Sequence, residues 1–208
     1  MSRESYNVDN REQKSLLEGV RVSALCKVTK FDASTMTVDV QPLSKALDGG
    51  VYRTPPPVLG VPVAMIRGGG FFLRPWYKSG DVGVIVYADH DIDRIAEAGQ
   101  ECQPNTERNH GDEDGIFVGA FIPKSNPISG VPDDTLVMST EGGSVYIALH
   151  HDHIEIKGDI KHTGDIEQTG NKKQTGRTDV TEDVTAAGIS LVHHTHTGDS
   201  GGSTSQPH

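Results

Sequence analysis

The stretch GDIKHT GDIEQT GNKKQT GRTDVT at residues 158–181 consists of four consecutive hexads, each of which begins with Gly and ends with Thr. Ile160 and Ile166 stand at the third position of the first two hexads, so one position of the repeat is marked for an interior. A period of six is typical of a β-helix, in which each short strand and turn advances the chain by one unit. The stretch therefore predicts a β-helical segment.

The repeat is too short and too polar for a β-helix made by one chain. Lys172 and Thr178 stand at the third position of the last two hexads, where a single-chain coil needs an aliphatic residue. Three intertwined chains, each supplying one face of a triangular prism, make a slender shaft without free strand edges from the same repeat. We therefore expect a homotrimer with a triple-stranded β-helix at 126–190, and the polar hexads leave room for water or other ions along its axis.

Short strands separated by turn residues precede the repeat. Apolar residues that alternate on both sides of a break at 31–34 predict a β-hairpin. Further strands and one short helix are predicted at 58–66, 81–87, 115–122 and, for the helix, 91–98. This set resembles an OB-fold, so the fold class is all-β, with an OB-fold-like collar domain at 20–125. The polar segment 1–19 is assigned to an N-terminal arm, in which the pattern at 12–18 allows a short helix.

Several residues of the collar invite a functional interpretation. The glycine run 68–70 is interpreted as a barrel loop, because the Lys-Ser/Thr of a phosphate-binding loop does not follow it. Phe71, Phe72 and Trp76 are expected to fill the barrel core. The acidic residues between 89 and 114 have no calcium-loop spacing and are interpreted as a solvated surface.

Composition and charge argue against several functions. Hydrophobic residues make up 34% and aromatic residues 5% of the 208 residues, so part of the chain needs other chains to bury its apolar surface. The formal net charge of −10 repels phosphate backbones, and no nucleic-acid partner is expected. Two cysteines give no disulfide framework, which fits assembly in a reducing cytoplasm. No window approaches the roughly 20 apolar residues of a membrane helix.

The C-terminal residues 191–208 carry the candidate metal ligands. His194 and His196 are two residues apart, which on a β-strand places both side chains on one face. If that face looks inward on a three-fold axis, three chains supply an octahedral set of six imidazole nitrogens, which suits a first-row transition metal such as iron. The extra histidines His193 and His208 leave open a register shifted to His193, although only the 194/196 pair has the matching spacing.

Another histidine cluster lies at 150–153. His150 and His153 are expected to point to opposite faces of a strand, so the cluster is interpreted as part of a turn between two strands.

A His-x-His motif with a Gly/Ser-rich, Pro-containing close at 194–207, after a repetitive β segment and an OB-like domain, resembles the membrane-piercing central spikes of contractile phage baseplates. These include the baseplate assembly protein V and Mu-like spike proteins, with type VI secretion spikes as more distant relatives. The resemblance covers the architecture from 20 to 208, and its specific motif lies in the last twenty or so residues.

This resemblance implies a homotrimer whose OB-fold collar docks on the baseplate hub protein and whose β-helix pierces the host outer membrane. At the apex, one iron ion per trimer is held by His194 and His196 of each chain. The protein is then made in the host cytoplasm and ends in the virion, at the tip of the tail baseplate.

Other functions stay open beside the spike. The sequence contains no nucleophile elbow, triad signature or acid pair, so an enzyme is not expected. Receptor-binding tail fibres and adhesin tips also use a His-x-His metal site to hold a trimer together. Only about twelve small polar residues follow His196, which is too few for a receptor-binding domain. A trimeric hexapeptide-repeat enzyme needs more aliphatic hexads, and histidines within the coils.

Overall fold

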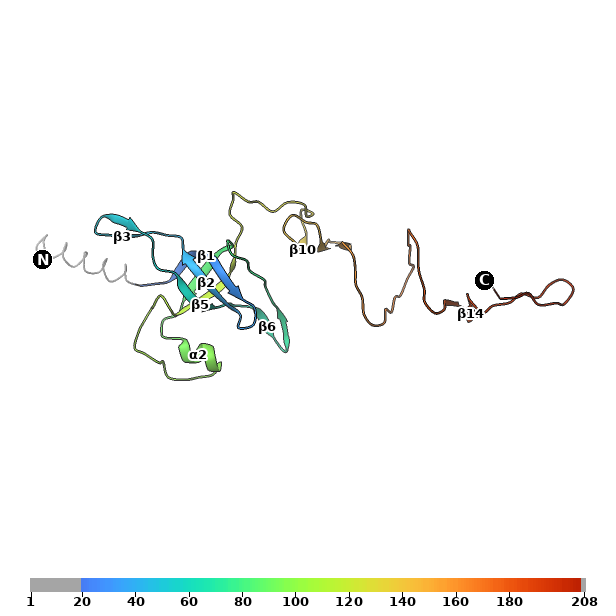
Figure 1. Cartoon of the computed structure of the whole chain (residues 1–208), viewed down its shortest axis with the longest axis horizontal. Helices are drawn as coiled ribbons and strands as arrows, with labels where there is room; N and C mark the ends of the chain where they lie inside the picture. Colours follow the sequence, from blue (N-terminus) through green and yellow to red (C-terminus); the bar gives the residue numbers. More distant parts are fainter. Residues whose placement is uncertain (1–19, 207–208) are drawn as a thin grey trace, which may run out of the picture. The chain divides into compact units, whose positions relative to one another are not determined.

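The computed structural model describes residues 20–206 of the chain (Figure 1). The N-terminal arm at 1–19, its short helix and His208 lie outside the described residues. The described part is nearly all β, which confirms the all-β fold class, and it divides into two compact units with a boundary after Gly158. No helix among residues 20–206 is long and apolar enough to cross a membrane.

A five-stranded antiparallel sheet forms the collar. Its strands, in the order in which they pair, are β5 (Val58–Pro62), β2 (Thr37–Pro42), β1 (Ser23–Asp32), β8 (Val82–Tyr87) and β9 (Gly115–Ala120). The two edges of the sheet approach each other, because Val63 forms a parallel bridge with Phe117 and the Ala64 amide donates to the Phe117 carbonyl at 2.8 Å. The sheet thus curls into a partly open barrel, as an OB-fold does (Figure 1).

The barrel core comes from the alternating residues of these strands. Cys26 and Val28 of β1 and Val38 and Val40 of β2 are fully buried, together with Phe117 of β9. Since successive side chains of a strand point to opposite faces, their neighbours in sequence stay at the surface. Burial raises the pKa of the Cys26 thiol to about 11, as expected for an unreactive core residue.

Two hairpins extend from the barrel: β3 (Ala46–Asp48) with β4 (Val51–Arg53), and β6 (Ile66–Gly68) with β7 (Phe71–Leu73). The loop predicted at the glycine run is the tight turn of the second hairpin. Gly69 and Gly70 have φ angles of 58° and 86° there, a left-handed conformation that glycine adopts without steric cost.

The prediction that Phe71, Phe72 and Trp76 fill the barrel core is wrong. Phe71 is 81% exposed and Trp76 is 72% exposed, and Phe72 is also at the surface. Among residues 20–206 no second layer covers these side chains of the β6–β7 hairpin, and the core position next to Trp76 is taken by Tyr77. The Tyr77 ring packs edge-to-face on Phe117, with the centroids 5.0 Å apart.

One short helix interrupts the strands, as predicted. This helix, α2 (Asp93–Ala98), ends at Gly99, which adopts a left-handed φ of 65° and whose amide donates to the Ile95 carbonyl. The long connection between α2 and β9 contains the polar cluster described below.

A three-stranded antiparallel sheet follows the collar. It consists of β10 (Leu136–Ser139), β11 (Tyr146–Leu149) and β12 (Ile154–Lys157). One face buries Tyr146 and Ala148. The other face is exposed and entirely aliphatic over two cross-strand rows, with Leu136, Leu149 and Ile154 in one row and Met138, Ile147 and Ile156 in the next.

The four hexads repeat in backbone conformation as well as in sequence. The glycines at their first positions have φ angles of 117°, 112°, 111° and 115° at Gly158, Gly164, Gly170 and Gly176. In the first three hexads the fifth side chain forms a hydrogen bond to a carbonyl three residues later, in the pairs His162–Asp165, Gln168–Asn171 and Gln174–Arg177. No strand and no backbone–backbone hydrogen bond occurs within the stretch 159–182 of the described chain.

Candidate functional site

A short hairpin precedes the C-terminal histidines. Its strands are β13 (Thr185–Ala186) and β14 (Ile189–Ser190), which pair in antiparallel fashion. The carboxylate of Asp183 accepts hydrogen bonds from the amides of Val184 at 2.8 Å and Val192 at 3.2 Å, so it links the chain before the hairpin to the chain after it. The Ser190 hydroxyl, together with these amides, holds the pKa of Asp183 below its usual range.

His194 is half-buried and its ring orientation is fixed by the backbone. Its Nδ1 atom lies 2.9 Å from the Ser190 carbonyl oxygen and 3.1 Å from the Leu191 carbonyl oxygen. A carbonyl only accepts hydrogen bonds, so Nδ1 carries the proton and Nε2 has the free lone pair. Metal-binding histidines in proteins are commonly oriented by such a bond from the other ring nitrogen.

His196 is held by the chain that follows it. The His196 amide donates to the Thr204 hydroxyl at 2.9 Å, and the Thr204 amide donates back to the His196 carbonyl at 2.8 Å. Within this loop, the Gly198 amide donates to the Gly202 carbonyl at 2.6 Å. The Gly/Ser-rich close therefore folds back on itself and fixes the backbone beside His196.

The structure brings the two predicted ligands together. The rings of His194 and His196 have centroids 5.1 Å apart and are perpendicular to each other, although neither residue lies in a strand. No third His, Cys, Asp or Glu of residues 20–206 joins them in a group that could hold a metal. Two imidazoles leave most of a coordination shell open, so a complete site at this pair needs further ligands.

The orientation predicted for His150 and His153 is wrong. Their rings stack with centroids 4.3 Å apart and an angle of 6° between the planes. The two residues flank the β11–β12 turn, where the His150 amide donates to the His153 carbonyl at 3.0 Å, so the alternation of a single strand does not apply. His150 Nε2 lies 3.2 Å from Glu155, and His153 Nδ1 lies 2.7 Å from Asp152.

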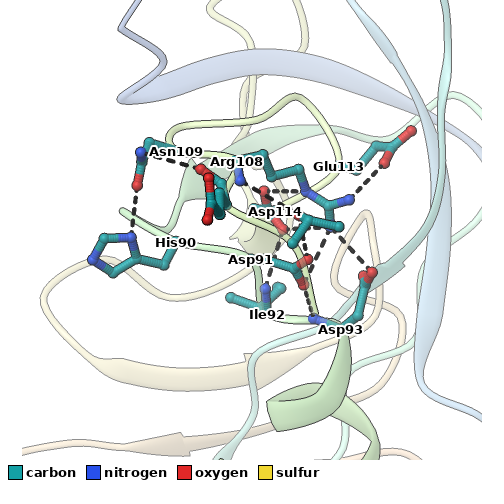
Figure 2. Close-up of polar contacts among 10 residues, drawn as sticks. His90, Asp91, Ile92, Asp93, Arg108, Asn109, Glu113 and Asp114 are labelled. Carbon is teal, nitrogen blue, oxygen red and sulfur yellow. Dashed lines mark hydrogen bonds and ion pairs between the residues drawn. The ribbon is translucent and has the colours of Figure 1, made fainter. Parts of the chain in front are cut away.

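Arg108 lies at the centre of a second polar cluster, next to α2. Its guanidinium donates two hydrogen bonds to Asp114, from Nε to Oδ2 at 2.7 Å and from Nη2 to Oδ1 at 2.8 Å (Figure 2). It also forms ion pairs with Asp91 at 3.4 Å, Asp93 at 3.2 Å and Glu113 at 3.2 Å. One cation therefore pairs with carboxylates at the start of α2 and with carboxylates just before β9.

The prediction of a solvated acidic surface is wrong for two of these carboxylates, since Asp91 is 1% exposed and Asp114 is 0% exposed. The Thr106 hydroxyl donates to Asp91 at 2.7 Å, and the Ile92 amide donates to Asp114 at 3.1 Å. The bond from Thr106 lowers the pKa of Asp91, and the bonds from Arg108 lower the pKa of Asp114, so both stay ionised although buried.

The same carboxylates could hold a cation, because Asp91, Asp93 and Asp114 offer oxygen atoms within 4.8 Å of one another. The guanidinium of Arg108 already contacts all three and compensates their charge. The cluster therefore acts as a structural clamp in which Arg108 joins the start of α2 to the residues just before β9 (Figure 2).

The barrel segment matches a known protein family. Residues 25–119, somewhat less than half of the chain, match the family described as the phage protein Gp138 N-terminal domain. No curated protein matches the chain. The matched segment coincides with the five-stranded collar, and it supports a structural protein of a phage and hence a component of the virion.

Proposed function

We propose that the chain is the central spike of a contractile phage tail, a trimeric needle that pierces the host outer membrane when the sheath contracts. The observation that carries the proposal is the repeat at 159–182, which has a regular backbone but no internal strand pairing. Backbone amides and carbonyls that are withdrawn from water need partners in the protein. Two further copies of the same repeat supply these partners and turn three extended chains into one shaft.

The distribution of aliphatic residues supports such a shaft. Between 154 and 184 every aliphatic residue has an even number, and all odd-numbered residues are polar or charged. The even-numbered set is exposed in the single chain: Ile154, Ile156, Ile160, Ile166, Val180 and Val184. Since residues of equal parity share one side of an extended chain, a three-fold arrangement buries this side and leaves the charged side in water.

The exposed face of the β10–β12 sheet continues the same pattern. Ile154 and Ile156 of β12 belong both to that face and to the even-numbered set. Monomeric proteins seldom expose an aliphatic patch of this kind. Three such sheets that pack face to face around an axis bury the patch.

At the other end, His194 and His196 of three chains close the apex around one iron ion. The residues fit the metal, because His194 presents a free Nε2 lone pair next to the His196 ring. A bound metal would supply a cross-link between three chain ends, with no catalytic step. The Gly/Ser-rich segment after His196 folds back on itself, which keeps the apex small.

The proposed role is mechanical, and the chain needs a partner to transmit force. The collar is the part that docks on the hub protein of the baseplate, which places the spike at the tip of the tail. The net charge of −10 on each chain argues against nucleic acid as a partner.

The location can be tested on phage particles that carry this protein. Gold-labelled antibodies against the collar are applied to particles with extended and with contracted sheaths and are imaged by electron microscopy. We expect label at the centre of the baseplate, and after contraction at the end of the inner tube. Label along peripheral fibres would contradict the spike and favour the tail-fibre alternative.

A further inference from the structure

The β6–β7 hairpin has two different faces. Ile66 pairs with Leu73 and Gly68 pairs with Phe71, so Ile66, Phe71 and Leu73 lie on one face, which is exposed. Arg67 and Phe72 pair on the opposite face, which lines a groove together with Met36 of the β1–β2 turn. The aliphatic and aromatic face therefore looks away from its own barrel.

The same chain has a second apolar surface on the outside of the barrel. Leu25 of β1, Val86 of β8, and Ile116 and Val118 of β9 alternate with core residues and are exposed. Strands of an antiparallel sheet that face water on one side normally carry polar residues there. This outer face is instead suited to contact with another apolar surface.

Charges near the two surfaces are complementary. Arg67 of β6 and Arg74, which follows β7, both line the groove on the opposite side of the hairpin, and the hairpin has no acidic residue of its own. Asp89 and Glu113 follow β8 and precede β9 at one end of the outer face, and both side chains are mainly exposed. A contact between the two surfaces would thus have an apolar centre, with basic residues near the hairpin and acidic residues near the outer face.

From these observations we infer that the β6–β7 hairpin of one copy docks on the outer β1–β8–β9 face of a neighbouring copy. The inference rests on the trimer of the proposed function, because three shafts around one axis bring three collars together. The two surfaces differ, so the contact is head-to-tail, and three such contacts close into a ring that leaves no surface of either kind unpaired. The collar is then an assembled ring before it meets the hub.

Disulfide trapping in the full chain tests the contact. Phe71→Cys combined with Val118→Cys, and separately Leu73→Cys combined with Ile116→Cys, are made in a Cys102→Ser background and oxidised. We expect covalent trimers on denaturing gels, because each chain links to the next around the ring. Each single cysteine variant should give no trimers, and a Leu47→Cys and Val118→Cys pair controls for the β3–β4 hairpin.

The mass of each variant in solution is measured before oxidation. If the variants are trimers but neither β6–β7 pair cross-links, or if only the Leu47 pair does, the hairpin contact is overturned while the trimer stands. If the chain is a monomer, the proposed function itself fails. Covalent dimers without trimers would indicate a two-fold contact and would also overturn the ring.

Discussion

The Nδ1 atom of His194 lies 2.9 Å from the carbonyl oxygen of Ser190 and carries its proton toward that oxygen. This one bond fixes the tautomer of the imidazole and leaves Nε2 as the atom that can bind a metal. The short hairpin that ends at Ser190 thus sets the direction of the proposed ligand. A metal at the apex is the feature that most clearly separates the proposed spike from a histidine-rich tail.

The even-numbered side of the repeat should be the buried side of the trimer. Replacement of Ile166 by Ala is expected to destabilise the trimer by about 2–5 kcal/mol per chain, since it removes a buried aliphatic side chain. The matched control Glu167→Ala changes the opposite side of the chain and should stay within about 0.5 kcal/mol. Thermal unfolding followed by circular dichroism measures both. Equal effects of the two variants would contradict the assigned parity.

Lys172 lies on the same even-numbered side of the repeat and should destabilise the trimer. It stands at the third position of its hexad, where Ile160 and Ile166 stand in theirs, so three ammonium groups approach the axis of the shaft. Like charges that are withdrawn from water repel each other, and Lys172→Ile is therefore expected to raise the melting temperature of the trimer. Lys173→Ile is the control on the solvent side and should not raise it. A drop for Lys172→Ile would show that this lysine makes contacts that the shaft needs.

The Arg108 clamp predicts how the collar responds to acid. Because the pKa values of Asp91 and Asp114 are lowered in the folded chain, their contribution to stability is fully present above the ordinary carboxyl value of 3.8. It is lost as the pH falls through the lowered values. The melting temperature of the collar should therefore fall steadily from about pH 5 to pH 2.

At neutral pH the melting temperature of the Arg108→Gln variant should be roughly 10 °C below that of the wild type, because the buried charge of Asp114 then has no partner. Its melting temperature should also depend less on pH in the acid range. Arg53→Gln breaks an exposed ion pair with Asp48 and should change neither property measurably. The same acid profile in Arg108→Gln and wild type would contradict the assigned role of the clamp.

The sequence predicted those features that depend on local periodicity. Alternation marked Cys26, Val28, Val38 and Val40, and these residues form the barrel core because a strand has two faces wherever it occurs. The short helix before Gly99 followed from an equally local signal.

Features that depend on tertiary contacts could not be predicted in this way. Trp76 looked like a core residue by its size, but the neighbouring Tyr77 occupies the core, a choice of face that one aromatic pair does not reveal. Arg108 was missed, since no periodicity connects an arginine in a loop with Asp91, which lies 17 positions earlier. The turn predicted at His150 and His153 is present, but their side chains were expected on opposite faces because the alternation of a strand was applied to them, whereas their rings stack.

Metal content together with mass in solution tests the central claim most directly, on the purified full chain and on a His194→Ala and His196→Ala double variant. The account predicts a wild-type trimer with about one iron ion per three chains, and a double variant without it. His193→Ala is the control and should keep the metal if the ligand pair is 194 and 196. A metal-free monomer would contradict the account, because the histidines would then be only a tail and the repeat would have no partner chains.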